Sequence, residues 1–147
     1  MTKLMLFPNF QSYILSLTAM QSQDTFLKME SIAKQQIESF TGLNDIFMGE
    51  VVSSANHDGF VHHPQGFRVR LYNGSFLQTV SGDSDNSRGK RSNLNIYDES
   101  GFLSEEYINV TSGFCLQDSS FKLGGGVNVD LIPNNMPNQL LFCSSAS

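Results

Sequence analysis

The sequence predicts an α/β fold, in which strands and helices alternate along the chain. A strand-like apolar run at 13–19 (YILSLTA) is followed directly by an amphipathic helical segment at 22–40. Two runs at 67–72 and 75–80 alternate between apolar and polar residues around an Asn-Gly pair, as in an antiparallel hairpin. The 147 residues, 39% of them hydrophobic, are enough for one domain with its own core.

The first strand and helix are expected from their periodicity. Residues 13–19 are apolar and partly alternating, which suits a core strand. The apolar stripe of the helix that follows consists of Phe26, Met29, Ala33, Ile37 and Phe40. We expect Ser22 to cap this helix and Gly42 to end it. From 42 to 66 the periodicity is lost, which predicts a loop with at most a short turn of helix.

Asn73-Gly74 is expected to form the hairpin turn, because both residues tolerate positive φ. A polar connector then leads to a short strand within LNIYDE, residues 94–99. Ser104 is placed to cap a helix starting SEEYINV, whose first-turn acids suit the helix dipole. A loose stretch rich in Gly and Pro precedes the last strand, QLLFCSS at 139–145.

Composition narrows the function classes. The net charge of -5 and pI near 5.0 argue against a general nucleic-acid binder, which needs an excess of Lys and Arg to neutralise phosphates. The chain shows neither a secretory signal nor an apolar run near the ~20 residues that span a bilayer. We therefore expect a soluble intracellular protein in which Cys115 and Cys143 are buried reduced thiols.

Asp98 and Glu99 end the apolar strand, which is the Walker B arrangement of nucleoside triphosphatases. There the aspartate holds the Mg²⁺ that bridges the phosphates, and the glutamate orients and deprotonates the attacking water. The alternative is a strand that ends in acids at a solvated loop, because a lone acid pair is a weak signal.

Four segments in order, FRVRLYNGSFLQTVSG, RGKR, NLNIYDESGF and LLFCSSAS, resemble the ATPase core of the large terminase subunit, the DNA-packaging motor of tailed bacteriophages. In that family an Asn-Gly-Ser turn precedes an Arg-Gly-x-Arg element, the Walker B strand and a Ser/Thr-rich strand end called motif III. The resemblance runs from Tyr13 to Ser147. It implies a three-layer fold with a largely parallel central sheet and an antiparallel hairpin.

The resemblance also implies roles for individual residues. Asp98 would be the Mg²⁺ ligand and Glu99 the catalytic base. Arg88 matches an arginine finger that reaches a neighbouring subunit's nucleotide, where a guanidinium stabilises the charge on the transferred phosphoryl group. Motif III, which senses the γ-phosphate, falls on Ser144, Ser145 and Ser147; an ordinary polar strand exit is the alternative there.

The sequence departs from the family in lacking the phosphate-binding motif G-x-x-x-x-G-K-[ST]. Lys90 follows Gly89, but Arg91 stands where the hydroxyl should be. We therefore expect residues 1–147 to be a partial ATPase domain that begins after this loop and stops at motif III, without the nuclease domain. Weak ATP binding, negligible turnover and an exposed apolar sheet edge should follow for the chain alone.

The complete motor implied by the resemblance would use Mg²⁺ and ATP to translocate DNA into a procapsid in the cytoplasm of an infected bacterium. Its partners would be other terminase subunits in a homo-oligomeric ring, the portal and DNA, with no membrane. A complementing chain that carries the phosphate loop is a further possible partner. The alternative function is a non-catalytic assembly module, or an inactive remnant of the same fold.

Three further groups have competing interpretations. His57, Asp58, His62 and His63 have metal-ligand side chains, but their spacing matches no common site and favours a solvated loop. Arg88, Lys90 and Arg91 could instead contact DNA phosphates or be solvated loop charges. The glycines at 124–126 favour a connector over a phosphate loop, since neither Lys-Ser/Thr nor a helix start follows them.

Overall fold

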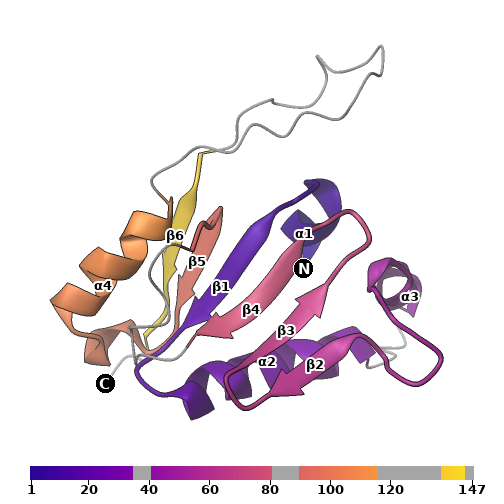
Figure 1. The fold of residues 1–147 in the computed structure, drawn as a ribbon, viewed down its shortest axis with the longest axis horizontal. Helices are drawn as coiled ribbons and strands as arrows, with labels where there is room; N and C mark the ends of the chain where they lie inside the picture. Colours follow the sequence, from indigo (N-terminus) through magenta and orange to yellow (C-terminus); the bar gives the residue numbers. More distant parts are fainter. Residues whose placement is uncertain (35–40, 81–89, 116–136, 145–147) are drawn as a thin grey trace.

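The computed structural model describes residues 1–34, 41–80, 90–115 and 137–144 (Figure 1). Within these ranges a six-stranded sheet has the order β2-β3-β4-β1-β5-β6. The strands are β1 (Gln11–Leu15), β2 (Phe60–His63), β3 (Gly66–Arg70), β4 (Phe76–Val80), β5 (Leu94–Tyr97) and β6 (Gln139–Phe142). The α-helices are α1 (Thr2–Leu6), α2 (Ala19–Lys34), α3 (Thr41–Glu50) and α4 (Glu105–Ser112), with short 3-10 helices η2 (Ser100–Phe102) and η3 (Gly113–Cys115).

The sheet is largely parallel. Strand β1 pairs in parallel with β4 on one side and β5 on the other, and β5 pairs in parallel with β6. Strand β3 runs antiparallel to both β2 and β4. The predicted α/β fold with an antiparallel hairpin on a parallel sheet is therefore confirmed.

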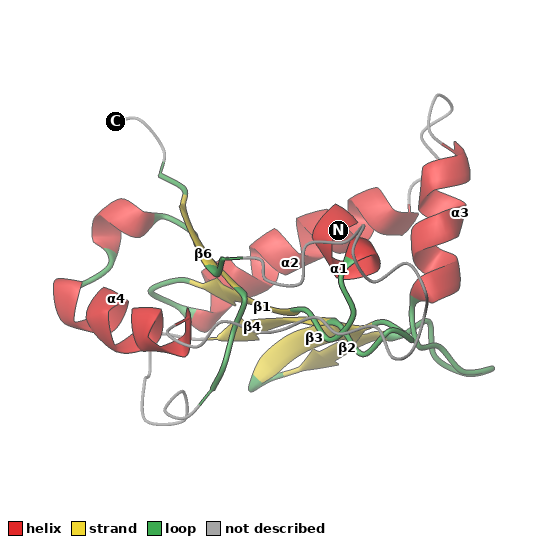
Figure 2. Ribbon diagram, turned by 90° about the horizontal axis from the view of Figure 1, so that it is seen from above, coloured by secondary structure: helices red, strands yellow, loops and turns green. Residues whose placement is uncertain are grey.

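Successive side chains of β1 point to opposite faces of the sheet, and helices pack against both faces. Ile14 belongs to an apolar cluster that includes Leu4 of α1, Phe26 of α2 and Phe47 of α3. Its neighbours Tyr13 and Leu15 point to the opposite face, where the second cluster contains Tyr107 of α4 and Phe114 of η3. Figure 2 shows the sheet edge-on with α1, α2 and α3 along one side. The three-layer arrangement is confirmed.

Helix α2 differs from its prediction at its start. It begins at Ala19, and the Thr18 hydroxyl accepts a bond from the backbone N–H of Gln21 at 3.3 Å. Ser22 lies buried inside the helix and donates to the carbonyl of Ala19 at 3.0 Å, so its assignment as the N-cap is wrong. Thr18 is the N-cap because its hydroxyl can accept from the Gln21 N–H, which has no partner within the first turn of the helix. Ile37 and Phe40 lie outside the described residues.

The loop predicted from 42 to 66 is wrong, because the segment contains most of α3 and all of β2. Phe47 of α3 is completely buried, and Val51 directly after the helix is 1% exposed. The glycines at 42 and 49 disfavour a helix, so the sequence pattern alone does not indicate one. Tertiary burial of these apolar side chains stabilises a helix that local propensity disfavours.

The hairpin turn forms where predicted, with a different conformation. The Gly74 N–H donates to the Leu71 carbonyl at 3.0 Å, and the Leu71 N–H donates to the Ser75 carbonyl at 2.9 Å. Gly74 has φ of 85°, whereas Asn73 keeps a negative φ, which is the three-residue loop with a glycine in the left-handed position. The Asn73 amide instead donates to the carbonyl of Leu4 at 2.7 Å and fastens α1 to the hairpin.

The first strand runs from Gln11 to Leu15 and not from 13 to 19, and Gly42, which was expected to end the first helix, lies inside α3. The last strands and the α4 cap are confirmed, but the prediction for the cysteines is wrong. Strands β5 and β6 lie within the predicted segments, and the Ser104 hydroxyl caps α4 by accepting from Tyr107 N–H at 3.2 Å. Both cysteines are free, but Cys143 is exposed because it follows an edge strand, and Cys115 is only half-buried. Within the described ranges, no helix has the length and apolar character needed to cross a membrane.

Candidate functional site

The candidate site lies where the carboxyl ends of β1, β5 and β6 meet. The Asp98 N–H donates to the carbonyl of Leu15 at 2.8 Å, which joins the turn after β5 to the end of β1. The Cys143 N–H donates to the Tyr97 carbonyl at 2.8 Å, and the Ser100 N–H donates to the Cys143 carbonyl at 2.8 Å. In open α/β sheets, ligands bind outside the carboxyl ends of parallel strands. The acid pair therefore stands at an edge suited to a ligand.

Asp98 is half-buried and held by donors on both carboxylate oxygens. Its Oδ1 accepts the backbone N–H of Glu99 at 3.1 Å. Its Oδ2 accepts the hydroxyl of Thr25, which comes from α2 in the neighbouring layer. These bonds orient the carboxylate, and each oxygen keeps lone-pair capacity for a further partner.

Glu99 adopts the left-handed conformation, with φ of 51° and ψ of 46°, directly before η2. An L-residue other than glycine costs about 1–2 kcal/mol in this region, and Asn or Asp tolerates it better than Glu. Such strained residues cluster at ligand sites and active sites. Sequence reasoning identified Glu99 as a candidate base, but nothing in the sequence signalled this backbone conformation.

Ser144 lies beside the turn after β5 that contains Asp98 and Glu99, which we call the acid turn. A β-carbon added to Gly101 would be 3.2 Å from the Ser144 hydroxyl oxygen, so this hydroxyl stands directly against the segment after Glu99. The structure thus brings together three of the sequence-predicted site residues: Asp98, Glu99 and Ser144. Ser145, Ser147 and Arg88 lie outside the described residues.

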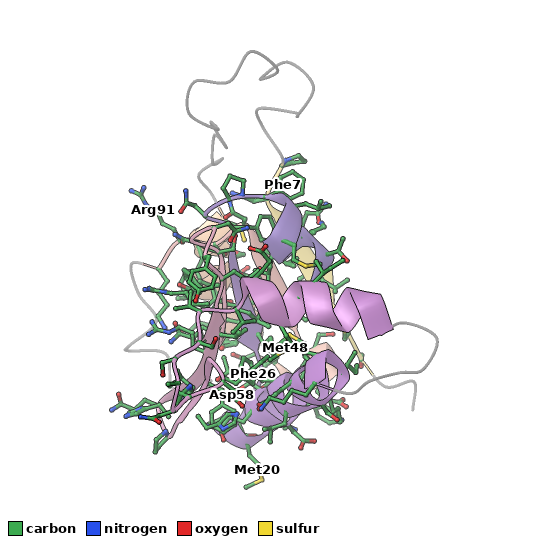
Figure 3. All side chains as sticks on the ribbon, turned by 90° about the vertical axis from the view of Figure 1, so that its right-hand side faces the viewer. Phe7, Met20, Phe26, Met48, Asp58 and Arg91 are labelled. Atoms are coloured by element: carbon green, nitrogen blue, oxygen red, sulfur yellow. The ribbon has the colours of Figure 1, made fainter. Side chains whose placement is uncertain are left out.

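The basic residues next to Arg88 stand at the other end of β5. Lys90 and Arg91 precede the strand, whereas Asp98 follows it. The Lys90 ammonium lies 5.5 Å from the centroid of the Tyr13 ring, and burial lowers the pKa of Lys90. Arg91 is exposed and extends away from the core (Figure 3). Within one chain, these two cations do not reach the acid pair.

A buried polar network that sequence reasoning missed holds β5 in place. The Asn95 amide donates to the carbonyl of Thr111 in α4 at 3.0 Å, and the Tyr97 and Thr111 hydroxyls are 2.9 Å apart. The Ser92 hydroxyl donates to Asn95 Oδ1 at 2.6 Å. The Tyr97 ring also stacks on Phe142 of β6, with centroids 4.7 Å apart. An asparagine in the middle of a short apolar strand was the available signal, because strands are depleted in this residue.

The histidine segment does not form a metal site among the described residues. His57 Nδ1 accepts from the Gly59 N–H at 2.9 Å, and His63 Nδ1 accepts from the Gln65 N–H at 3.2 Å. His62 Nε2 lies 2.5 Å from a carboxylate oxygen of Glu30, which is only 6% exposed. His57 and His63 thus accept bonds from backbone N–H groups in local turns, and His62 contacts Glu30; because His62 and His63 lie on β2, the loop interpretation is wrong for them.

An ionic cluster at the rim of α2 was also missed. The Lys34 ammonium contacts the carboxylates of both Glu30 and Asp58. The hydrogen bond from Lys34 lowers the pKa of Asp58. Burial tends to lower the pKa of Lys34, but the bonds to Asp58 and Glu30 outweigh it and raise the pKa. The buried Glu30 carboxylate is thus paired with the Lys34 ammonium and also contacts His62, as a buried charge requires partners.

The donor chemistry of the turn fits Mg²⁺. This hard cation prefers oxygen ligands and is usually bound through one or two carboxylates, with substrate phosphates and waters completing its shell. Asp98 supplies an oriented carboxylate, Glu99 a second acid, and Ser144 a hydroxyl nearby. ATP would need further contacts to its phosphates, because the sequence contains no glycine-rich loop ending in Lys-Ser or Lys-Thr.

No family model and no curated protein matches the chain. Solved structures that are similar include the large terminase ATPase domain of Thermus phage P74-26, with a TM-score of 0.46 and 16% identity over 95% of this chain and 49% of that one. The large terminase of a thermophilic bacteriophage, solved in complex with ADP, has a TM-score of 0.46 and 12% identity over 96% of this chain and 33% of that one. A mutant of the P74-26 domain has a TM-score of 0.40 and 15% identity, over 95% of this chain and 65% of that one. The chain thus spans less than two thirds of each of these structures.

Proposed function

We propose that this chain supplies the Walker B to motif III region of a terminase-like DNA-packaging ATPase, which in complete form hydrolyses Mg²⁺-ATP to translocate DNA. The observation that carries the proposal is the turn at the carboxyl end of β5. Asp98 is oriented there by two donors, Glu99 is held in a left-handed conformation, and Ser144 lies alongside. The sequence motifs support the same function by their order.

In this proposal Asp98 holds Mg²⁺, which neutralises charge on the phosphates, and Glu99 takes the proton from the attacking water. Ser144 and Ser145 contact the nucleotide at the γ-phosphate position as motif III. Nucleotide binding is weak unless a phosphate-binding loop is supplied, because the acid turn by itself offers no cradle of N–H groups. The large terminase of the thermophilic bacteriophage was solved with ADP bound.

Arg88 is proposed to act on a neighbouring subunit's nucleotide in a homo-oligomeric ring, where the portal and DNA are further partners. Its neighbours Lys90 and Arg91 lie at the opposite end of β5 from Asp98, which favours a role outside the site of its own chain. A guanidinium delivered there stabilises the charge that develops on the transferred phosphoryl group.

The proposal is tested by Glu99→Gln in a motor completed by a chain or segment that carries the phosphate loop. We expect loss of ATP hydrolysis with ATP binding retained, because the change removes the base and keeps the metal ligand. The matched control is Glu106→Gln, an exposed acid in the first turn of α4, which should leave hydrolysis unchanged. Hydrolysis that persists in Glu99→Gln would contradict the assignment.

Arg88→Ala tests the role between subunits. In a ring made only of this variant, ATP turnover should fall by about 10³-fold or more, the usual effect of losing an arginine finger. Mixing with Glu99→Gln subunits should restore part of the activity, since each variant then supplies what the other lacks. Mixed rings that stay inactive would contradict a finger acting in trans.

A non-catalytic assembly module is favoured by a different observation. Among the described residues β6 is the outermost strand of the sheet, and its Leu140, Leu141 and Phe142 are 41%, 49% and 49% exposed. Exposed apolar strand edges pair readily with another strand. The mass of the native polypeptide should be determined after detection with an antibody against residues 88–108. A product of 16.3 kDa that never hydrolyses ATP with any loop-bearing partner would favour the module.

A further inference from the structure

Helix α2 reaches the candidate site through the side chain of Thr25. Its hydroxyl donates to Oδ2 of Asp98 across 73 residues of sequence. We propose that Thr25 is a positioning residue, which sets the orientation in which the Asp98 carboxylate meets a divalent cation. This inference rests on the proposed function, because it presupposes that Asp98 binds the metal.

The helix is held so that Thr25 must face Asp98. The next residue, Phe26, is fully buried between α2 and the sheet (Figure 3), and its ring packs against Phe60 and Phe67 with centroids 6.1 and 5.8 Å away. Rotating α2 about its axis would expel this ring from the core. On the other side, the Asp98 N–H is fixed to the carbonyl of Leu15 at 2.8 Å. The two partners are therefore positioned from different layers before any ligand arrives.

The hydroxyl proton of Thr25 is used in the bond to Asp98 and not in a bond within the helix. A threonine inside a helix can donate its single hydroxyl proton to a carbonyl of the preceding turn, and this bond slightly destabilises the helix. Thr25 instead donates to a side chain at the end of β5. Such a bond restrains a carboxylate whose terminal torsion is otherwise broad.

Two donors fix the plane of the carboxylate. Oδ1 accepts from the Glu99 N–H at 3.1 Å and Oδ2 from Thr25, while the remaining lone pairs stay available to a cation or its waters. A ligand already held in its bound orientation loses less conformational freedom on binding. Without the Thr25 hydroxyl, the Glu99 N–H would be the one remaining donor to the Asp98 carboxylate among the described residues, and cation binding would then have to order the carboxylate as well.

The test compares Thr25→Val, which keeps the branched shape and removes the hydroxyl, with Thr25→Ser, which keeps the hydroxyl. Mn²⁺ alone is titrated into the full chain, and paramagnetic broadening is followed at the amide signals of residues 98–101. We expect the wild type and Thr25→Ser to need the same Mn²⁺ concentration for half-broadening. Thr25→Val should need about threefold to tenfold more, the factor that one lost hydrogen bond gives.

Two controls separate positioning from folding. Met29→Ala removes a side chain of α2 that packs on the apolar core, so it should lower stability without changing the Mn²⁺ concentration. Thr25→Ala repeats the hydroxyl deletion without a branched side chain, in case Thr25→Val does not fold. If Thr25→Val or Thr25→Ala reaches half-broadening at the wild-type Mn²⁺ concentration, the positioning role is wrong. The proposed function would not be affected by this result. If Asp98→Asn does not reduce the wild-type broadening, the metal role of Asp98 fails, and this inference fails with it.

Discussion

The two halves of the sheet are stabilised in different ways. The half formed by β2, β3 and β4 packs against α1, α2 and α3 through completely buried apolar side chains such as Phe26, Phe47 and Val69, with its charges at the rim. The half formed by β5 and β6 has an exposed edge, and beneath β5 lies a network of asparagine, tyrosine and threonine. Apolar burial supplies most of the stability of a fold, whereas directional bonds specify geometry. The candidate site lies on the half that has the buried network around Asn95.

One helix connects the two halves. Five residues apart on α2, Thr25 donates to Asp98 beside β5, and Glu30 pairs with His62 of β2. Between them, Phe26 anchors the helix in the apolar core. The orientation of the candidate metal ligand therefore depends on packing in the half that contains no site residue.

The largest effect is expected from Phe26→Ala, which tests whether the apolar half carries the stability. The change should cost about 3–5 kcal/mol of unfolding free energy, because it removes a fully buried ring and leaves a cavity. Urea unfolding followed by circular dichroism measures this loss. The control is Met20→Ala in the same helix, where a side chain 78% exposed should matter by less than about 0.5 kcal/mol. Equal losses of unfolding free energy in the two variants would contradict the expectation that buried apolar side chains stabilise this half.

Thr111→Val should cost about 2 kcal/mol, because the buried Tyr97 O–H loses its acceptor 2.9 Å away and keeps only the bond that it accepts from the Asn95 amide at 3.3 Å. Hydrogen exchange should show faster opening confined to β5 and α4. Ser112→Ala, next in the same helix, removes an exposed hydroxyl bonded to the Asn109 carbonyl and should cost little. A loss spread evenly over both halves of the sheet would contradict a separate, hydrogen-bonded half.

The same difference explains how far sequence reasoning reached. The hairpin, α2, β5, the capped α4 and the acid turn were predictable, since periodicity, an Asn-Gly pair and a serine cap are local signals. Helix α3 was not, because the burial of Phe47 stabilises it against unfavourable glycines. Thr25, Thr111 and Glu30 were not either, because their partners lie far along the chain. Asp98 and Glu99 could be found as a motif, but the bonds and backbone strain that set their geometry required the fold.

Glu99→Gly should raise the unfolding free energy by about 1 kcal/mol, although it removes the proposed base. Glycine adopts the left-handed conformation that Glu99 has at φ of 51° without the strain that a side chain imposes there. Chemical denaturation of the two proteins measures the difference. Glu105→Gly, in the first turn of α4, is the control and should destabilise, because a helical residue gains no such relief. A loss of stability in Glu99→Gly would show that no strain is stored at the turn.

The smallest effect concerns the ionic rim of the apolar half and appears in acid. Lys34 holds the pKa of Asp58 below its ordinary value of 3.8, so this pair contributes stability in full above that pH, and the contribution is lost as the pH falls through the lower folded-state value. Because the Asp58 side chain is 48% exposed, solvent screening limits the contribution to a few tenths of a kcal/mol. Asp58→Asn keeps an oxygen for the Phe60 N–H, which Asp58 Oδ1 accepts at 3.1 Å, and removes the charge. Its unfolding free energy should therefore vary less than that of the wild type between about pH 5 and pH 2.5. Identical pH profiles would show that the rim charges add nothing to the half of the sheet that apolar burial already holds.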